Sequence, residues 1–291
     1  MRDLFINQAF DFFLWLVRLL PYNFLKYLIS ILSLVATIML KKYRMIHKRN
    51  YTLVYGEEIC FYKVFATTYN IYKILGMQAL DVLTFIEGKY PKYNFVSKVQ
   101  GSSYLNEAIN KHNGLIVVSA HIGNFTLLNL LIKELGFSNC AMVMRNVKNK
   151  HIEEKFNYIR QKANIRFFNE SSIKKNILLL ARFLKEKGIL IMITDQRHLK
   201  GIPLKFFDGI KKSPMGPASL SILTGAPILP FFAVRAKDGG SNIVIQKPIY
   251  AEGLTLTDKN VENITLKINK ALEGFIKENF NQWFCFHQWW K

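Results

Sequence analysis

One histidine in this chain has the type and the setting of a catalytic residue. His121 follows an apolar run and precedes a glycine in the segment GLIVVSAHIGNFT, residues 114–126. A neutral imidazole takes a proton from a hydroxyl group near pH 7, so His121 is a candidate general base. The alternative is a structural histidine buried in the core.

The residues on both sides of His121 predict where it lies. Leu115–Val118 is an uninterrupted β-favouring run, typical of a strand covered on both faces. Gly123 and Asn124 suit a tight turn and a helix N-cap, and the apolar stretch after them stops at Gly136. His121 is therefore expected at the carboxyl end of a strand, beside a helix N-terminus, where open α/β sheets bind ligands.

Three other charged residues follow predicted strands or lie on the next helix. Asp195 comes just after the apolar run ILIMI, Arg145 follows the short strand CAMVM, and Arg160 lies on the helix after it. A capping aspartate and solvated arginines are the alternatives for these residues. Taken with His121, they predict a charged site at the edge of a sheet.

Strand-like and helix-like segments alternate through most of the chain. A helix is predicted from about Ser172 to Lys187, before Gly188, and the pattern from Tyr51 to about Gly88 is mainly helical. Aromatic residues at helical spacing in that region predict core contacts: Phe61, Phe65, Tyr69 and Tyr72. Strands are predicted near 115–120, 140–144, 165–168, 189–194, 227–235 and 242–248. This order predicts an α/β fold with a mostly parallel sheet flanked by helices.

The first forty residues are strongly apolar. Tyr22–Leu40 carries one charge, Lys26, and a basic cluster occupies residues 41–49. An apolar segment of about 19 residues can span a bilayer, with the basic cluster on the cytoplasmic side. Helices lying in the membrane interface, or packed on the domain, are the alternatives. The simplest division is a membrane-inserting helical segment, residues 1–45, and an α/β domain, residues 46–291.

The charge of the chain indicates an anionic partner. The formal net charge is +20 at pH 7. Half of the residues are hydrophobic and no zinc-finger, RNP-type or basic-zipper pattern occurs, so anionic membrane lipids or an acidic carrier fit better than nucleic acid. The cysteines Cys60, Cys140 and Cys285 lack metal-ligand spacing, so neither a metal site nor a disulfide framework is predicted.

Four segments occur in order along the chain: SAHIGNF, the DQ at Asp195, the FF-x-G run with SPMGPASLSILTGAPILP, and the terminal QWFCFHQWWK. Together they resemble segments of the bacterial lipid A biosynthesis acyltransferases, the late lauroyl/myristoyl transferases of the lysophospholipid-acyltransferase-like superfamily. The resemblance implies a glycerolipid-acyltransferase-like fold. It implies transfer of a fatty acyl chain from acyl carrier protein, or a coenzyme A thioester, to a hydroxyl of a lipid A precursor. It requires no further cofactor and implies an inner-membrane enzyme whose catalytic domain faces the cytoplasm.

The resemblance also implies roles for particular residues. His121 matches the family's general base, and Arg160 and Asp195 match a supporting arginine and aspartate. Arg145, in an Arg-x-x-x-Asn setting completed by Asn149, matches a phosphate-binding position. The remaining substrate-binding candidates are Asn124, Thr126, Lys211 and Lys212.

The chain departs from the family at one important position. The family places Glu or Asp five residues after the histidine, and this chain has Thr126 there. Either the Thr126 hydroxyl holds the imidazole, or Asp195 supplies the negative charge across the site. One alternative function is an acyltransferase of the same fold acting on another glycolipid, lysolipid or amino-acid lipid. The departure at Thr126 adds a second, a non-catalytic lipid- or carrier-binding relative.

Overall fold

The computed structural model describes residues 2–88, 95–111, 114–147, 149–169 and 173–290. Within them, one seven-stranded sheet has the order β1-β9-β8-β2-β5-β3-β4. Its strands are β1 (Val96–Gln100), β2 (Leu115–Ser119), β3 (Cys140–Met144), β4 (Arg166–Asn169), β5 (Ile189–Ile193), β8 (Ile228–Arg235) and β9 (Ser241–Ile245). The pairing of β8 with β9 is antiparallel and the other pairings in the sheet are parallel.

Strand β2 lies between β5 and β8, where the strand order reverses. The chain continues from β2 toward β3 on one side and returns later to β8 on the other. This is the switch point at which doubly wound sheets form a crevice beyond the carboxyl ends of the strands. The residues after β2 therefore enter that crevice.

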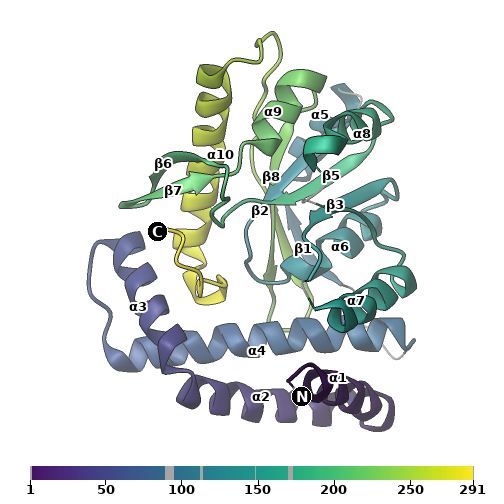
Figure 1. Cartoon of the computed structure of the whole chain (residues 1–291), viewed down its shortest axis with the longest axis vertical. Helices are drawn as coiled ribbons and strands as arrows, with labels where there is room; N and C mark the ends of the chain where they lie inside the picture. The colour runs from purple at the N-terminus through teal and green to yellow at the C-terminus, as the bar shows by residue number, and fades with distance from the viewer. Residues whose placement is uncertain (1, 89–94, 112–113, 148, 170–172, 291) are drawn as a thin grey trace.

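Helices cover both faces of the sheet (Figure 1). Ile116 and Val118 of β2 lie in one buried cluster with side chains of α8, α9 and α10, whereas Leu115 and Val117 lie in a second with those of α5 and α6. Successive strand residues point to opposite faces, so an unbroken apolar run fits a strand buried on both sides. The helices are α5 (Ser102–Lys111), α6 (Leu128–Glu134), α7 (Lys150–Lys162), α8 (Ile173–Lys185), α9 (Gly216–Thr224) and α10 (Asp258–Glu278).

The amino-terminal helices form a separate layer. Helix α4 (Phe61–Ile86) runs beneath the sheet in Figure 1, and α1 (Arg2–Leu19) and α2 (Tyr22–Met39) lie on its other side, while α3 (Lys41–Tyr55) connects α2 to α4. Helix α2 buries every fourth residue: Leu25, Ile29, Ser33 and Thr37. Among the described helices, α2 has the length and apolar composition to cross a membrane.

A hairpin and a carboxyl-terminal segment complete the fold. Strands β6 (Ile202–Phe206) and β7 (Gly209–Ser213) pair antiparallel. After α10, a short 3₁₀ helix, η3 (Phe280–Gln282), leads into residues 283–290, which pack back onto the domain.

The fold class predicted from the sequence is confirmed, and each of the six predicted strands is present within three residues of its predicted ends. Strand β1 and the β6–β7 hairpin were not predicted, because VSKVQ, IPLKF and GIKKS lack long apolar runs. The predicted helix near 172–187 is α8, whose predicted first residue lies outside the described residues. The division at residue 45 remains a prediction.

Two local predictions were wrong. The Asn124 side chain makes no helix cap: a 3₁₀ turn, η1 (Phe125–Leu127), precedes α6, and the amide instead bonds Ser241. Phe61, predicted to be in the core, is 73% exposed. Helical spacing shows that residues share a face, but the tertiary packing decides whether that face is covered.

We expect Gly123→Ala to lower the free energy of unfolding by more than about 3 kcal/mol. Gly123 has φ +52°, and a Cβ there would lie 2.6 Å from Val234 Cα on β8, where backbone cannot easily move. Gly225→Ala is the matched control, because Gly225 also has positive φ (+74°) but has open space around it. It should cost about 1–2 kcal/mol. Equal losses in denaturant unfolding of the two variants would contradict the close approach.

Candidate active site

His121 and Asp195 are hydrogen-bonded. Imidazole Nδ1 lies 2.7 Å from carboxylate Oδ1. The register of the parallel strands pairs Ser119 of β2 with Ile193 of β5, and the two site residues each lie two positions beyond that pair. The sheet therefore brings together side chains that are 74 positions apart in sequence.

Asp195 is fully enclosed, and both of its oxygens are bonded. Trp283 Nε1 donates to Oδ2 at 2.8 Å. Burial opposes ionisation of this carboxyl, but the bonds from His121 and Trp283 outweigh it and hold its pKa at about 2. Because the ionised carboxylate accepts the Nδ1–H proton, Nε2 is the ring nitrogen whose lone pair can accept a proton. The pair thus has the arrangement of a general base with its orienting carboxylate.

The carboxyl-terminal segment fixes the backbone of the histidine loop. Phe284 N donates to His121 O at 2.7 Å, and Gly123 N donates to Gln282 O at 3.1 Å. The terminal motif was noted in the sequence, but Trp283 was not identified as a site residue. One general property could have pointed to Trp283: the N–H of a buried indole usually has a hydrogen-bond acceptor.

Lys211 lies behind the dyad, in the interior. Its Nζ donates to Thr194 O at 3.2 Å and sits 3.6 Å from the centre of the Phe206 ring. Burial lowers the pKa of Lys211 to about 7, although Asp195 and Glu273 act in the opposite direction. Lys212 is exposed, since neighbouring strand residues face opposite sides. Of the two lysines predicted to bind phosphate, only Lys212 is exposed to solvent.

A cavity of about 690 Å³ opens beside the dyad. Four of the predicted site residues lie in its wall: His121, Thr126, Arg145 and Arg160. Arg197 and His198, which directly follow the DQ motif, also line it and were not predicted. Much of the remaining wall is apolar and comes from several elements, among them α1 with Phe10, α4 with Leu75 and Val82, β3 with Met142 and α7 with Phe156. The cavity suits a ligand with a long apolar part and an anionic group.

Arg160 is held rigidly in the cavity wall. Its Nη1 bonds Glu153 Oε1 at 2.6 Å, and the guanidinium stacks over the Phe167 ring at 4.3 Å. Burial of Glu153 opposes its ionisation, but the bond from Arg160 lowers the pKa of this carboxyl. Arg160 is thus positioned by residues of its own helix and of β4.

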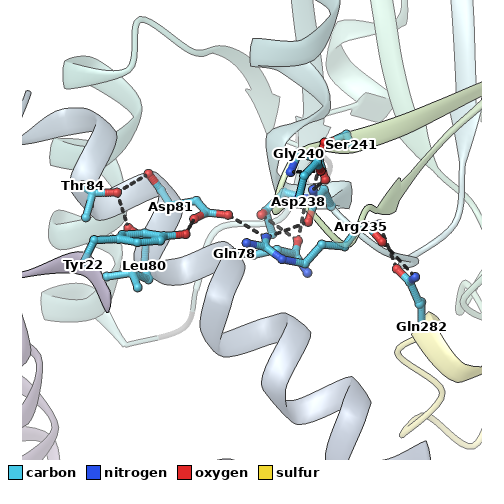
Figure 2. A network of polar contacts seen from close by, with 12 residues as sticks. Tyr22, Gln78, Leu80, Asp81, Thr84, Arg235, Asp238, Gly240, Ser241 and Gln282 are labelled. Atoms are coloured by element: carbon cyan, nitrogen blue, oxygen red, sulfur yellow. Dashed lines mark hydrogen bonds and ion pairs between the residues drawn. The ribbon is translucent and has the colours of Figure 1, made fainter. Parts of the chain in front are cut away.

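Asn124 is buried away from the cavity wall. Its amide donates to Ser241 Oγ at 2.8 Å and accepts from Arg235 Nη1 at 3.2 Å. The same Arg235 nitrogen bonds Asp81 of α4 at 2.6 Å, and Asp81 accepts from Tyr22 OH, at the start of α2, at 2.7 Å (Figure 2). Asn124 therefore ties the histidine loop to β8, β9 and the amino-terminal helices.

Thr126, at the family's carboxylate position, bonds Gln78 of α4. Its hydroxyl and its backbone N–H lie 2.8 and 3.1 Å from Gln78 Oε1. The sequence left open whether the Thr126 hydroxyl or the Asp195 carboxylate holds the imidazole. The contacts match Asp195, because it is the carboxylate bonded to His121.

No group of three or more His, Cys, Asp or Glu side chains in the described part of the chain is arranged to hold a metal ion.

Residues 3–291 match the sequence profile of the family described as bacterial lipid A biosynthesis acyltransferase. Among solved structures, the chain is similar to the 1-acyl-sn-glycerophosphate (LPA) acyltransferase PlsC from Thermotoga maritima. The two share 15% identity over 89% of this chain and 99% of that chain, with a TM-score of 0.39. A comparison with curated proteins found no significant match.

We expect Lys211 to make the protein more stable as the pH rises from 7 to 9, by roughly 2 kcal/mol. With a pKa near 7 in the folded state and 10.5 in the unfolded state, the unfolded chain binds more protons over this range. Lys211→Met should remove this rise and Lys212→Met should keep it. Denaturant unfolding at both pH values measures the difference, and a rise that persists in Lys211→Met would contradict the assignment.

Proposed function

Because the chain belongs to the family of bacterial lipid A biosynthesis acyltransferases, we propose that it transfers a fatty acyl chain from acyl carrier protein to a hydroxyl group of a lipid A precursor. The observation that carries the proposal is that His121, which lines a largely apolar cavity, is hydrogen-bonded to the buried carboxylate of Asp195. The pair supplies a base for the hydroxyl, and the cavity, within the usual size range of ligand pockets, supplies a place for the acyl chain.

The reaction follows from these groups. His121 Nε2 removes the proton from the acceptor hydroxyl as its oxygen attacks the thioester carbonyl carbon. The carbonyl electron pair moves to its oxygen, giving a tetrahedral oxyanion. When that pair returns, the carbon–sulfur bond breaks and the thiol leaves with the proton from the imidazolium. Asp195 stabilises the imidazolium between these two steps.

Positive charge around the cavity supports anionic substrates. Arg145 and Arg197 line the cavity, and Lys212 is exposed on the β6–β7 hairpin. We assign the phosphates of the precursor to this side, with Arg160 anchored by Glu153 in the same wall. The net charge of +20 also favours an acidic carrier protein as acyl donor, with coenzyme A thioesters as the alternative.

The exposed side of α2 supports our placing the protein at the cytoplasmic face of the inner membrane. It carries large apolar residues, among them Tyr27, Ile31, Val35 and Ile38, and α1 adds Phe12 and Trp15. The basic cluster at residues 41–49 follows directly and suits anionic headgroups. Phe10 of α1 also lines the cavity. The amino-terminal helices would therefore form the side of the cavity that lies toward the membrane, where the acyl chain could enter.

We expect His121→Ala to lower kcat for acyl transfer by about 10²–10⁴-fold, because the substitution removes the general base. Asp195→Asn should cost up to about 10⁴-fold, because an amide does not hold the reactive tautomer. Both variants should retain membrane association, and circular dichroism checks their fold. The assay incubates the detergent-solubilised protein with acyl-carrier thioesters and a tetra-acylated, sugar-bearing lipid A precursor, with mass spectrometry of the products.

The outcomes of this assay separate the candidate functions. One added acyl mass that depends on His121 supports the proposal. Full activity in His121→Ala would remove the residue from the mechanism. Precursor binding with no transfer by the wild type would indicate a non-catalytic relative, and transfer to a different lipid would indicate another acceptor.

We expect the triple variant Ile31→Ser, Val35→Ser, Ile38→Ser to bind anionic vesicles at least about tenfold more weakly. Each of these exposed side chains contributes up to about 2 kcal/mol when it leaves water. Leu178→Ser, at an exposed apolar position on α8, is the control and should bind like the wild type. Vesicle flotation measures the difference, and unchanged binding of the triple variant would exclude this side of α2 as the membrane contact.

A further inference from the structure

The Asp195 carboxylate has a different partner at each oxygen. Oδ1 lies 2.7 Å from His121 Nδ1, and Oδ2 accepts from Trp283 Nε1 at 2.8 Å. Among the described residues, Trp283 is the one that donates a hydrogen bond to Oδ2. A carboxylate turns easily about its last side-chain bond, so donors to both oxygens decide which oxygen faces the imidazole.

The fold around Trp283 fixes the place of its ring. The residue is 1% exposed and packs edge-on against Phe280, with ring centroids 5.7 Å apart. Its backbone forms an antiparallel bridge with Ile122, the residue that follows the base. The next residue, Phe284, donates its N–H to His121 O at 2.7 Å. One short segment therefore holds both the backbone of the base and the carboxylate that orients it.

Trp283 acts on the site through Asp195. It lies outside the cavity wall, whereas His121 lines the cavity. Asp195 is 1% exposed, so water does not replace the indole as a donor to Oδ2. A hydrogen bond to an ionised group is strong, and a buried charged oxygen left without its donor is costly. Loss of the indole N–H would therefore change the orientation of the carboxylate, its basicity, or both.

We propose that Trp283 is a positioning residue for acyl transfer: its indole N–H keeps the Asp195 carboxylate turned so that Oδ1 accepts from His121 Nδ1 and leaves Nε2 for the acceptor hydroxyl. This inference rests on the proposed acyl transfer. The indole keeps its proton throughout the reaction. By sharing the charge of the carboxylate, it also limits how strongly Asp195 holds the imidazolium, which must give its proton to the leaving thiol.

Other titratable groups surround the pair. Lys211 of β7 favours the ionised form of Asp195, and Cys285 and His287 of the carboxyl-terminal segment also interact electrostatically with this carboxylate. The cationic or titratable side chains that share the cavity wall with His121 are Arg145, Arg160, Arg197 and His198. A substitution at Trp283 leaves all of these groups in place, so a change in pH profile reports the bond to Asp195.

Trp283→Phe keeps an aromatic ring and removes the N–H donor. We expect kcat for transfer from an acyl-carrier thioester to fall by about 10–100-fold with little change in KM. Without the indole bond the carboxylate is more basic, so the pair keeps its proton to higher pH. The acidic limb of the kcat/KM profile should therefore move upward by about half to one pH unit.

Trp289→Phe is the matched control. Trp289 is also 1% exposed, and in the described part of the chain its Nε1 has no hydrogen-bond partner. This variant makes the same change in ring size in the core without removing a bond to Asp195. It should keep the wild-type kcat and the wild-type pH profile, and thermal unfolding of both variants measures the cost of the altered packing.

Replacement of Trp283 by benzothienylalanine tests the bond without a packing defect, because sulfur takes the place of the N–H and the ring keeps its shape. It should show the same fall in kcat and the same displaced limb as Trp283→Phe. Wild-type kcat and an unmoved acidic limb in this protein overturn the inference while leaving the proposed function intact. Absence of transfer by the wild type overturns the proposed function, and this inference with it.

Discussion

The parallel register of β2 and β5 is the constraint on which the site depends. It places His121 and Asp195 side by side, two residues beyond a paired position of the central strands. Both strands are buried on both faces. A slip of one residue would move every side chain to the opposite face of the sheet, into a packing site of a different shape. The packing of the core therefore also fixes the distance between His121 and Asp195.

An ionised carboxylate inside a protein is costly unless it is paired and hydrogen-bonded. Around Asp195 this requirement is met by His121, by the Trp283 indole and by the nearby Lys211. Trp283 reaches this position because the carboxyl-terminal segment returns to the histidine loop after α10. Beneath it, His47 of α3 lies 2.9 Å from Cys285 Sγ and 2.7 Å from Thr67 Oγ1. Burial lowers the pKa of His47 to about 4, so this contact is uncharged at neutral pH.

Helix α4 connects the layer of amino-terminal helices to the candidate site. One side of it packs against α2, where Gly76 lets Ile29 approach closely. The other side provides the apolar cavity wall together with two polar residues at adjacent turns, Gln78 toward Thr126 and Asp81 toward Arg235. The same helix therefore lines the cavity and contributes polar contacts to the histidine loop and to β8.

The sequence by itself determined the elements whose signal is local. Apolar and β-favouring segments located the six predicted strands, with unbroken apolar runs at β2 and β5, and the residues at the ends of those two led to His121 and Asp195. The tertiary structure decided which of these residues meet. It paired His121 with Asp195, buried Lys211 while leaving Lys212 exposed, and brought Trp283 and Gln78 to the site from distant elements. The physical reason is that periodicity records which side of an element is apolar, whereas register and packing between distant segments decide which polar side chains share one cavity.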